Sequence, residues 1–317
     1  MAYLAALLYR LHVVTGLVAG LFFSILGVTG AALAFRPALE QSWYIPKSAA
    51  TANSFSWDQV ALHVSQGPPG RRIREARLRP GHATEFVVHN RDGSAATSHY
   101  VDPASGRVLA ERNHDSSPFE ALRSWHTHLS AGPYGRILVS RLGLLLMLQA
   151  IIGAVIWILR GKPGNWHTYL GLAALMPLLL LAYSGFHVMT TRFTVVTPVV
   201  TLRGVENKAP LDTIVATATK RRQGFELTRI DFPQAPSQPF AFWFGDQNPE
   251  RVVYMDPYGA VLPMMIPTQL NQVQLWHSGP AGGAPAAFFR LLTGLAIPLL
   301  WTIALWRHWQ SRRSRNA

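Results

Sequence analysis

The 317-residue sequence contains no cysteine. This absence excludes disulfide bonds, covalent haem attachment through a Cys-x-x-Cys-His motif, and metal clusters held by thiolates. Any metal or cofactor must therefore be bound by histidine, methionine, carboxylate or backbone groups. The glycine motifs of nucleotide-binding proteins and the nucleophile motif of α/β-hydrolases are also missing, and the chain has no recognisable nucleic-acid-binding module.

Charged residues are scarce, because they make up 14% of the chain against about 25% in soluble domains. Four stretches have no charged residue: 11–35, 142–159, 163–191 and 291–306. A transmembrane helix needs about 20 mostly apolar residues. The second and fourth stretches reach that length if the flanking Arg141 and Arg290 lie at the interface with their stems buried. The sequence therefore predicts four transmembrane helices.

The basic residues predict the orientation in the membrane. The short loop 160–166 and the C-terminal segment 307–317 are basic, and short basic segments remain in the cytoplasm. Both termini and this loop are therefore predicted to be cytoplasmic. The two long intervening segments then lie in the periplasm of a bacterium whose inner membrane holds the protein.

The predicted fold class is an α-helical membrane protein made of two duplicated halves, each with two transmembrane helices and one periplasmic α+β domain. Strand-like segments that lead into Asp-Pro turns at 102–103 and 256–257 support the α+β assignment. The predicted boundaries are 7–35 for the first transmembrane helix, 36–124 for the first periplasmic domain, 125–159 for a segment leading into the membrane with the second helix, 160–166 for the cytoplasmic loop, 167–190 for the third helix, 191–275 for the second periplasmic domain, 276–306 for a second leading segment with the fourth helix, and 307–317 for the cytoplasmic tail.

A Trp-His dipeptide occurs twice, as Trp125-His126 and Trp276-His277, each time before a long apolar run. Upstream, each half opens with His-x-x-x-Gly-Leu, beginning at His12 and at His167. The two copies are offset by about 155 residues, a period that indicates duplication of a whole unit. Four histidines therefore hold equivalent places, two in each copy.

These four histidines predict two haem sites, because an ionisable residue inside a membrane span marks a functional site by default. His12 and His167 both begin outward-running helices and lie on the cytoplasmic side. His126 and His277 both precede inward-running helices and lie on the periplasmic side. Imidazole suits iron and a low-spin haem takes two axial nitrogens, so the pattern predicts two b haems, each with two histidine ligands. The alternative is four structural histidines bonded to carbonyls or water.

Several other residues belong to the predicted sites. His187 could replace His126 or His277 as a ligand on the periplasmic side, and His128 is a further alternate, although the repeat favours His126. Haem propionates need basic partners. The predicted partners are Arg10, Arg160 and Lys162 on the cytoplasmic side and Arg136, Arg141 and Arg290 on the periplasmic side, although anchoring by positive charge explains the cytoplasmic set equally well.

Four motifs, taken in order, resemble the PepSY-associated transmembrane family over nearly the whole chain. They are Leu11-His12-x3-Gly16-Leu17, His126-x5-Gly132-x2-Gly135-Arg136, Trp166-His167-x3-Gly171-Leu172 and His277-x-Gly279, and each exported module ends in an Asp-Pro turn. The resemblance implies that both periplasmic domains are PepSY-like. The family includes inner-membrane siderophore reductases of the ferrioxamine-reducing type, which carry two b haems.

The resemblance implies a haem-dependent ferric-siderophore reductase. Electrons would cross the inner membrane and reduce a ferric-siderophore in the periplasm, so that iron leaves as the more weakly bound Fe(II) during iron uptake. The electron donor stays open between a quinol and a cytoplasmic reductase, and membrane lipid surrounds the helices. The alternative hypothesis is a non-redox membrane protein whose PepSY-like domains bind a periplasmic partner or ligand.

Overall fold

The structure is a computed structural model that describes residues 2–48, 54–66, 70–90, 96–114, 116–161, 164–190, 198, 200, 208–245, 251–263, 273, 276–277 and 283–316. Parts of the predicted loop 160–166, of both predicted periplasmic domains and of the segment after His277, including Gly279, lie outside the described residues. The chain forms two compact units. Unit 1 consists of Met1–Leu39, Pro118–Phe193 and Gln269–Ala317, and unit 2 of Glu40–Ser117 and Thr194–Thr268.

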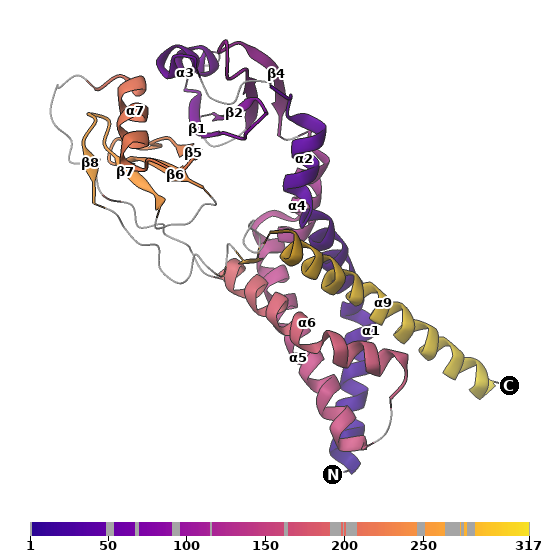
Figure 1. Cartoon of the computed structure of the whole chain (residues 1–317). Helices are drawn as coiled ribbons and strands as arrows, with labels where there is room; N and C mark the ends of the chain where they lie inside the picture. The colour runs from indigo at the N-terminus through magenta and orange to yellow at the C-terminus, as the bar shows by residue number, and fades with distance from the viewer. Residues whose placement is uncertain are drawn as a thin grey trace. The chain divides into compact units, whose positions relative to one another are not determined.

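Unit 1 is a bundle of long apolar helices (Figure 1). Four of them are long and apolar enough to cross a membrane, since each exceeds the required length of about 20 residues. The prediction of four such helices is confirmed, and the chain is a membrane protein. Among its described residues, the unit contains the helices α1 (Ala2–Leu33), α4 (Pro118–His128), α5 (Gly132–Arg160), α6 (Trp166–Thr190) and α9 (Gly283–Asn316), of which α4 is the short one.

The helices of unit 1 do not pack in chain order. α1 packs along α9, α5 packs along α6, and α4 packs against both α1 and α5. The predicted segment 125–159 is divided, because α4 ends at His128 and α5 begins at Gly132. Between them Leu129 and Ser130 have φ of 48° and 55°, a left-handed conformation that is uncommon for residues with a side chain. This turn ends α4 beside α1.

Unit 2 contains, among its described residues, one antiparallel sheet of eight strands in the order β4-β3-β2-β1-β5-β6-β7-β8. The sequence placed these strands in two periplasmic domains, but β1 and β5 pair, with Glu75 opposite Asp231 and Arg77 opposite Arg229. The two segments therefore share one sheet. The strands are β1 (Arg72–Arg77), β2 (Thr84–His89), β3 (Thr97–Val101), β4 (Val108–Asn113), β5 (Leu227–Asp231), β6 (Phe240–Phe244), β7 (Val253–Met255) and β8 (Val261–Leu262).

Two short helices, α3 (Trp57–Ser65) and α7 (Leu211–Arg221), complete the main core of unit 2. Their apolar side chains join those of the strands in one buried cluster. A third helix, α2 (Arg36–Tyr44), lies at the boundary of the two units along the chain. The largest members of the cluster with no more than 1% exposure are Phe86, Phe242, Phe244, Ile214, Ile230, Met255 and Val64.

The helices α3 and α7 cap each other. The Asp58 carboxylate accepts hydrogen bonds from the backbone N–H groups of Leu211 (2.8 Å) and Asp212 (3.0 Å) at the start of α7. The Asp212 carboxylate accepts from the backbone N–H of Trp57 (2.6 Å) and the Ser56 hydroxyl (2.6 Å) at the start of α3. Each acidic side chain thus satisfies donors that a helix N-terminus leaves unpaired, which ties the two segments together.

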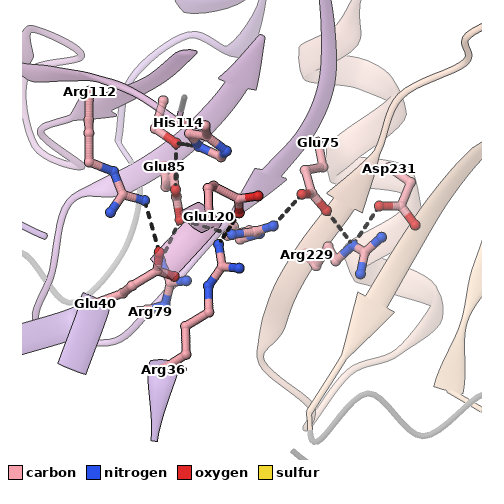
Figure 2. Close-up of polar contacts among 12 residues, drawn as sticks. Arg36, Glu40, Glu75, Arg79, Glu85, Arg112, His114, Glu120, Arg229 and Asp231 are labelled. Carbon is pink, nitrogen blue, oxygen red and sulfur yellow. Dashed lines mark hydrogen bonds and ion pairs between the residues drawn. The ribbon is translucent and has the colours of Figure 1, made fainter. Parts of the chain in front are cut away.

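A network of charges crosses the junction between β1 and β5 (Figure 2). Glu75 accepts from Arg77 (2.5 Å) and from Arg229 (3.0 Å), and Arg229 also contacts Asp231 (2.5 Å). Residues of like charge lie opposite each other across the two strands, Glu75 opposite Asp231 and Arg77 opposite Arg229. Each of them forms an ion pair with a neighbour of the opposite charge, which offsets the repulsion. The shared sheet is therefore held by ion pairs as well as by backbone hydrogen bonds.

Glu85 continues this network on β2. Its side chain is only 2% exposed and contacts Arg79 (3.1 Å) and Arg77 (3.5 Å), while the Ser98 hydroxyl donates to it (2.6 Å). Burial alone would raise the pKa of Glu85, but the two guanidinium groups and the hydroxyl outweigh burial and lower the pKa to about 2. Glu85 is therefore ionised in the folded protein at neutral pH.

Candidate functional site

His12 of α1 and His167 of α6 are neighbours, with ring centres 6.2 Å apart and ring planes at 78° to each other. The Nδ1 of His167 lies 3.1 Å from the Leu300 carbonyl oxygen of α9. A carbonyl can only accept, so Nδ1 carries the proton and Nε2 keeps the free lone pair. The Nδ1 of His12 is buried and has no hydrogen-bond partner among the described residues. Both rings thus have a nitrogen available to a ligand or a metal.

A cavity of about 500 Å³ contains both rings, within the range of roughly 300–1,000 Å³ that is common for small-molecule sites. Its walls come from α1, α5, α6 and α9, and glycines are among the residues that line it. A Cβ atom at Gly153 would lie 3.0 Å from His12 Cε1. Trp301 of α9 packs so closely against Gly20 of α1 that a side chain at position 20 would displace the Trp301 ring. These glycines therefore let the side chains that line the cavity, among them the His12 ring, lie close against the neighbouring helices.

Gln149 of α5 is a residue of this site that the sequence analysis missed. Its amide nitrogen donates to the His12 carbonyl oxygen (2.6 Å), and its amide oxygen accepts from the Thr15 hydroxyl (2.7 Å). A polar group at this depth is costly unless it is paired, so these bonds fasten α1 to α5 at His12. The available signal was a single amide in the uncharged run 142–159.

His126 of α4 and His277 form the second pair, with ring centres 6.3 Å apart. The Nδ1 of His126 lies 3.0 Å from the Leu26 carbonyl oxygen and 3.2 Å from the Thr29 hydroxyl of α1. The Nδ1 of His277 lies 2.8 Å from the Ser184 hydroxyl of α6. These bonds place both rings against the transmembrane helices and leave Nε2 of each ring to face a ligand.

The two hydroxyls act as acceptors for the ring nitrogens. Thr29 donates its own proton to the Ile25 carbonyl (2.7 Å), and Ser184 donates to the Leu181 carbonyl (3.1 Å). The Leu26 carbonyl can only accept, so Nδ1 of His126 carries the proton, and the Ser184 hydroxyl can accept from Nδ1 of His277 while it donates to Leu181. A histidine that binds a metal through one nitrogen commonly donates from the other in this way.

The contacts of His126 and His277 with the transmembrane helices are alike in the two halves of the sequence. Thr29 and Ser184 are 155 positions apart, as are His12 and His167, and each hydroxyl contacts the Trp-His histidine of its own half. The residue after each hydroxyl is a glycine whose Cβ would lie 2.7 Å (Gly30) or 3.2 Å (Gly185) from that histidine ring. The same local arrangement therefore holds His126 and His277.

The helix crossings repeat in the same way. Gly27 of α1 meets Gly294 of α9, where a Cβ on Gly27 would lie 2.5 Å from the Gly294 carbonyl oxygen. Gly143 of α5 meets Ala182 of α6, where the corresponding distance is 3.5 Å. Small residues at both crossings let the backbones approach closely, which brings the two halves of the bundle together around the histidine pairs.

The separation of each pair fits one metal ion between two imidazoles. A ring nitrogen binds a transition metal at about 2.0 Å, and the centre of the ring lies roughly 1.1 Å behind that nitrogen, so two rings whose nitrogens point at one metal ion should have centres about 6.2 Å apart. The observed separations are 6.2 Å and 6.3 Å. Within the described residues no group of three or more His, Asp or Glu side chains could hold a bare metal ion. Two nitrogens suffice for an iron whose other ligands come from a porphyrin.

The alternates lie elsewhere. The ring of His187 stacks on Tyr183, one turn earlier in α6, at 5.9 Å. His128 follows His126 in the last turn of α4, and its buried Nδ1 has no hydrogen-bond partner in the part of the chain that the structure describes. The ring next to that of His277 is that of His126.

The predicted basic partners lie in different surroundings, and Lys162 lies outside the described residues. Arg290 is partly buried, and its guanidinium donates to the Trp276 carbonyl oxygen (2.8 Å), beside His277. Arg136 and Arg141 are exposed on α5. Arg10 is exposed on α1 and is not among the residues that line the cavity, whereas Arg160 and Arg307 line it.

The bundle and its paired histidines define a membrane protein with two candidate sites for a cofactor that takes two imidazole ligands. The sequence model of one family, described as the PepSY-associated TM region, matches residues 9–312, and the chain belongs to that family. None of the curated proteins compared with the chain matches it.

Proposed function

We propose that this protein is a b-type di-haem oxidoreductase of the bacterial inner membrane. It passes electrons across the membrane to a ferric-siderophore in the periplasm, and the iron leaves the siderophore as Fe(II). The observation that carries the proposal is the occurrence of two histidine pairs, each with the ring separation that one axially ligated iron requires.

The residues of the two sites suit this cofactor. His12 and His167 would hold one haem in the glycine-lined cavity, and His126 and His277 would hold the other. When bound, haem supplies one-electron chemistry at its iron. The protein supplies the imidazole ligands, and through Leu300, Leu26 and the hydroxyls it sets the tautomer and the orientation of the rings.

The offset of 155 positions, which relates His12 to His167 and Thr29 to Ser184, supports a duplicated bundle. One pair joins the histidines that open the two halves, and the other joins the histidines of the two Trp-His motifs. His12 and Thr29 lie 17 positions apart on α1, so the two pairs are separated by about 25 Å along that helix at a rise of 1.5 Å per residue. Two sites at this spacing suit electron transfer across an apolar layer of about 30 Å.

Unit 2 is the candidate for binding the acceptor, because the loop charges predict that its two segments are periplasmic. A ferric-siderophore is too polar to enter the apolar bundle, so it has to meet the electrons at the periplasmic side. The cytoplasmic side then receives electrons from a quinol or from a cytoplasmic reductase.

The visible spectrum of the purified protein tests the proposal. The reduced protein should show the α and Soret bands of a b-type haem, and pyridine haemochrome analysis should give two haems per chain. Protein in liposomes, chemically reduced beforehand, should be reoxidised by ferric-siderophore added on the side of unit 2, with Fe(II) trapped by a chelator. A colourless protein, purified from cells supplied with haem, would overturn the proposal and favour a non-redox role in which unit 2 binds a partner.

A further inference from the structure

The cavity around His12 and His167 has one polar, exposed end. The exposed residues Arg160, Asn165, Arg307 and Ser311 line it there, with Tyr9 close by. The Arg160 guanidinium lies 4.2 Å from the centre of the Tyr9 ring, a cation–π contact that holds the charge at the cavity opening.

The interior of the cavity is apolar by contrast. Phe23 and Leu178 line it and are 4% and 5% exposed. A ligand that fills this space must therefore have an apolar body and a polar edge directed to the opening. The polar edge meets two guanidinium groups, which bind carboxylates through two parallel hydrogen bonds.

The protein itself provides almost no negative charge to balance these arginines. The sequence of unit 1 contains a single acidic residue, Glu120, and its carboxylate contacts Arg36 (2.7 Å) and Arg123 (2.6 Å). No Asp or Glu lies among the described residues that line the cavity. The balancing anion for Arg160 and Arg307 is therefore expected from a ligand.

We propose that Arg160 and Arg307 form a receptor for the carboxylates of a flat amphiphilic ligand whose body lies between His12 and His167. This inference rests on the proposed function, in which that ligand is haem and the carboxylates are its propionates. Of the cytoplasmic residues that the sequence offered, it selects Arg160 and leaves out Arg10, it adds Arg307, and it orients the haem with its carboxylate edge toward the opening.

The test compares haem with its dimethyl ester, which keeps the ring and the iron but has no carboxylates. The full chain is produced without haem and titrated with each compound in detergent, and the spectrum at the Soret band reports binding with two imidazole ligands. In the wild-type protein, one of the two binding sites should bind the ester about tenfold more weakly than haem. The factor is no larger because an exposed charge-assisted contact contributes modestly.

The double substitution Arg160→Gln with Arg307→Gln should weaken haem binding at this site and leave ester binding unchanged. The preference of the site for haem over the ester should then disappear. Arg10→Gln is the matched control, because it removes an exposed charge from α1 without changing the cavity lining. If the wild-type protein binds haem and the ester equally at both sites, the proposed carboxylate receptor is refuted while the di-haem proposal stands. The same holds if Arg10→Gln abolishes the preference for haem over the ester and the double substitution does not. If neither compound binds, both proposals are refuted.

Discussion

The hydroxyl groups beside the second histidine pair permit a matched test of the site, by Ser184→Ala and Thr29→Ala. The two positions are equivalent in the repeat, but their surroundings differ. His277 Nδ1 contacts the Ser184 hydroxyl at 2.8 Å, whereas His126 Nδ1 contacts both the Leu26 carbonyl at 3.0 Å and the Thr29 hydroxyl at 3.2 Å. Removing Ser184 therefore takes away the acceptor that the structure shows for His277. Removing Thr29 leaves His126 its carbonyl.

The magnitude follows from this difference. Loss of a second-shell partner of a ligating histidine costs about 10–100-fold in affinity for the metal group, so Ser184→Ala should weaken haem binding at this site by that factor. Thr29→Ala should change it by less than about threefold, since the shorter of the two bonds to His126 remains. The haem at His12 and His167 should be unaffected in both variants.

The assay is haem titration of the two variants, followed at the Soret band, together with the midpoint potentials of the two haems. Ser184→Ala should also shift the potential of one haem only, because the ring loses basicity when its Nδ1 proton has no acceptor. Ser184→Thr should restore both quantities. Equal effects of Ser184→Ala and Thr29→Ala, or a change at both haems, would refute the assignment of these hydroxyls to one site.

Three further predictions concern ligation, pH and topology. His167→Ala should remove one of the two haems, as counted by pyridine haemochrome, whereas His187→Ala should retain both, and the opposite result would mean that the ligands are misassigned. The folded-state pKa of Glu85 is about 2, below its ordinary 4.5, so Glu85 stabilises the fold above about pH 4.5 and this contribution, about 3 kcal/mol, is lost as the pH falls toward 2. Because pH 3.5 lies between the two pKa values, less than half of this contribution, about 1.4 kcal/mol, should be lost between pH 7 and pH 3.5. Denaturant unfolding at the two pH values should therefore show a loss about 1.4 kcal/mol larger in the wild-type protein than in Glu85→Gln, and an equal loss in both would contradict the role of Glu85. Reporter fusions at positions 163 and 317 should both report the cytoplasm, and a periplasmic signal at either would overturn the orientation.

The sequence alone determined the membrane helices, and it indicated which histidines would lie close together. Helix length and the absence of charge are local properties, because a run of apolar residues that spans the bilayer has to satisfy its backbone within itself. The repeat then placed His12 with His167 and His126 with His277, since equivalent positions on helices of known direction lie at equal depth. Both pairs are adjacent in the structure.

Only the tertiary structure decided how the rest of the chain serves these residues. The pairing of β1 with β5 joins strands that are far apart in the sequence, and no local pattern specifies which edge strands meet. The sequence also does not specify that Gln149, Arg160 and Arg307 lie at the cavity of His12 and His167. Their positions depend on how α5 and α9 pack against α1 and α6. Hydrogen-bond partners of a buried ring, such as Leu300 and Ser184, are likewise set by helix packing. Contacts between distant segments depend on the three-dimensional approach of helices and strands, whereas hydrophobicity and periodicity are encoded residue by residue.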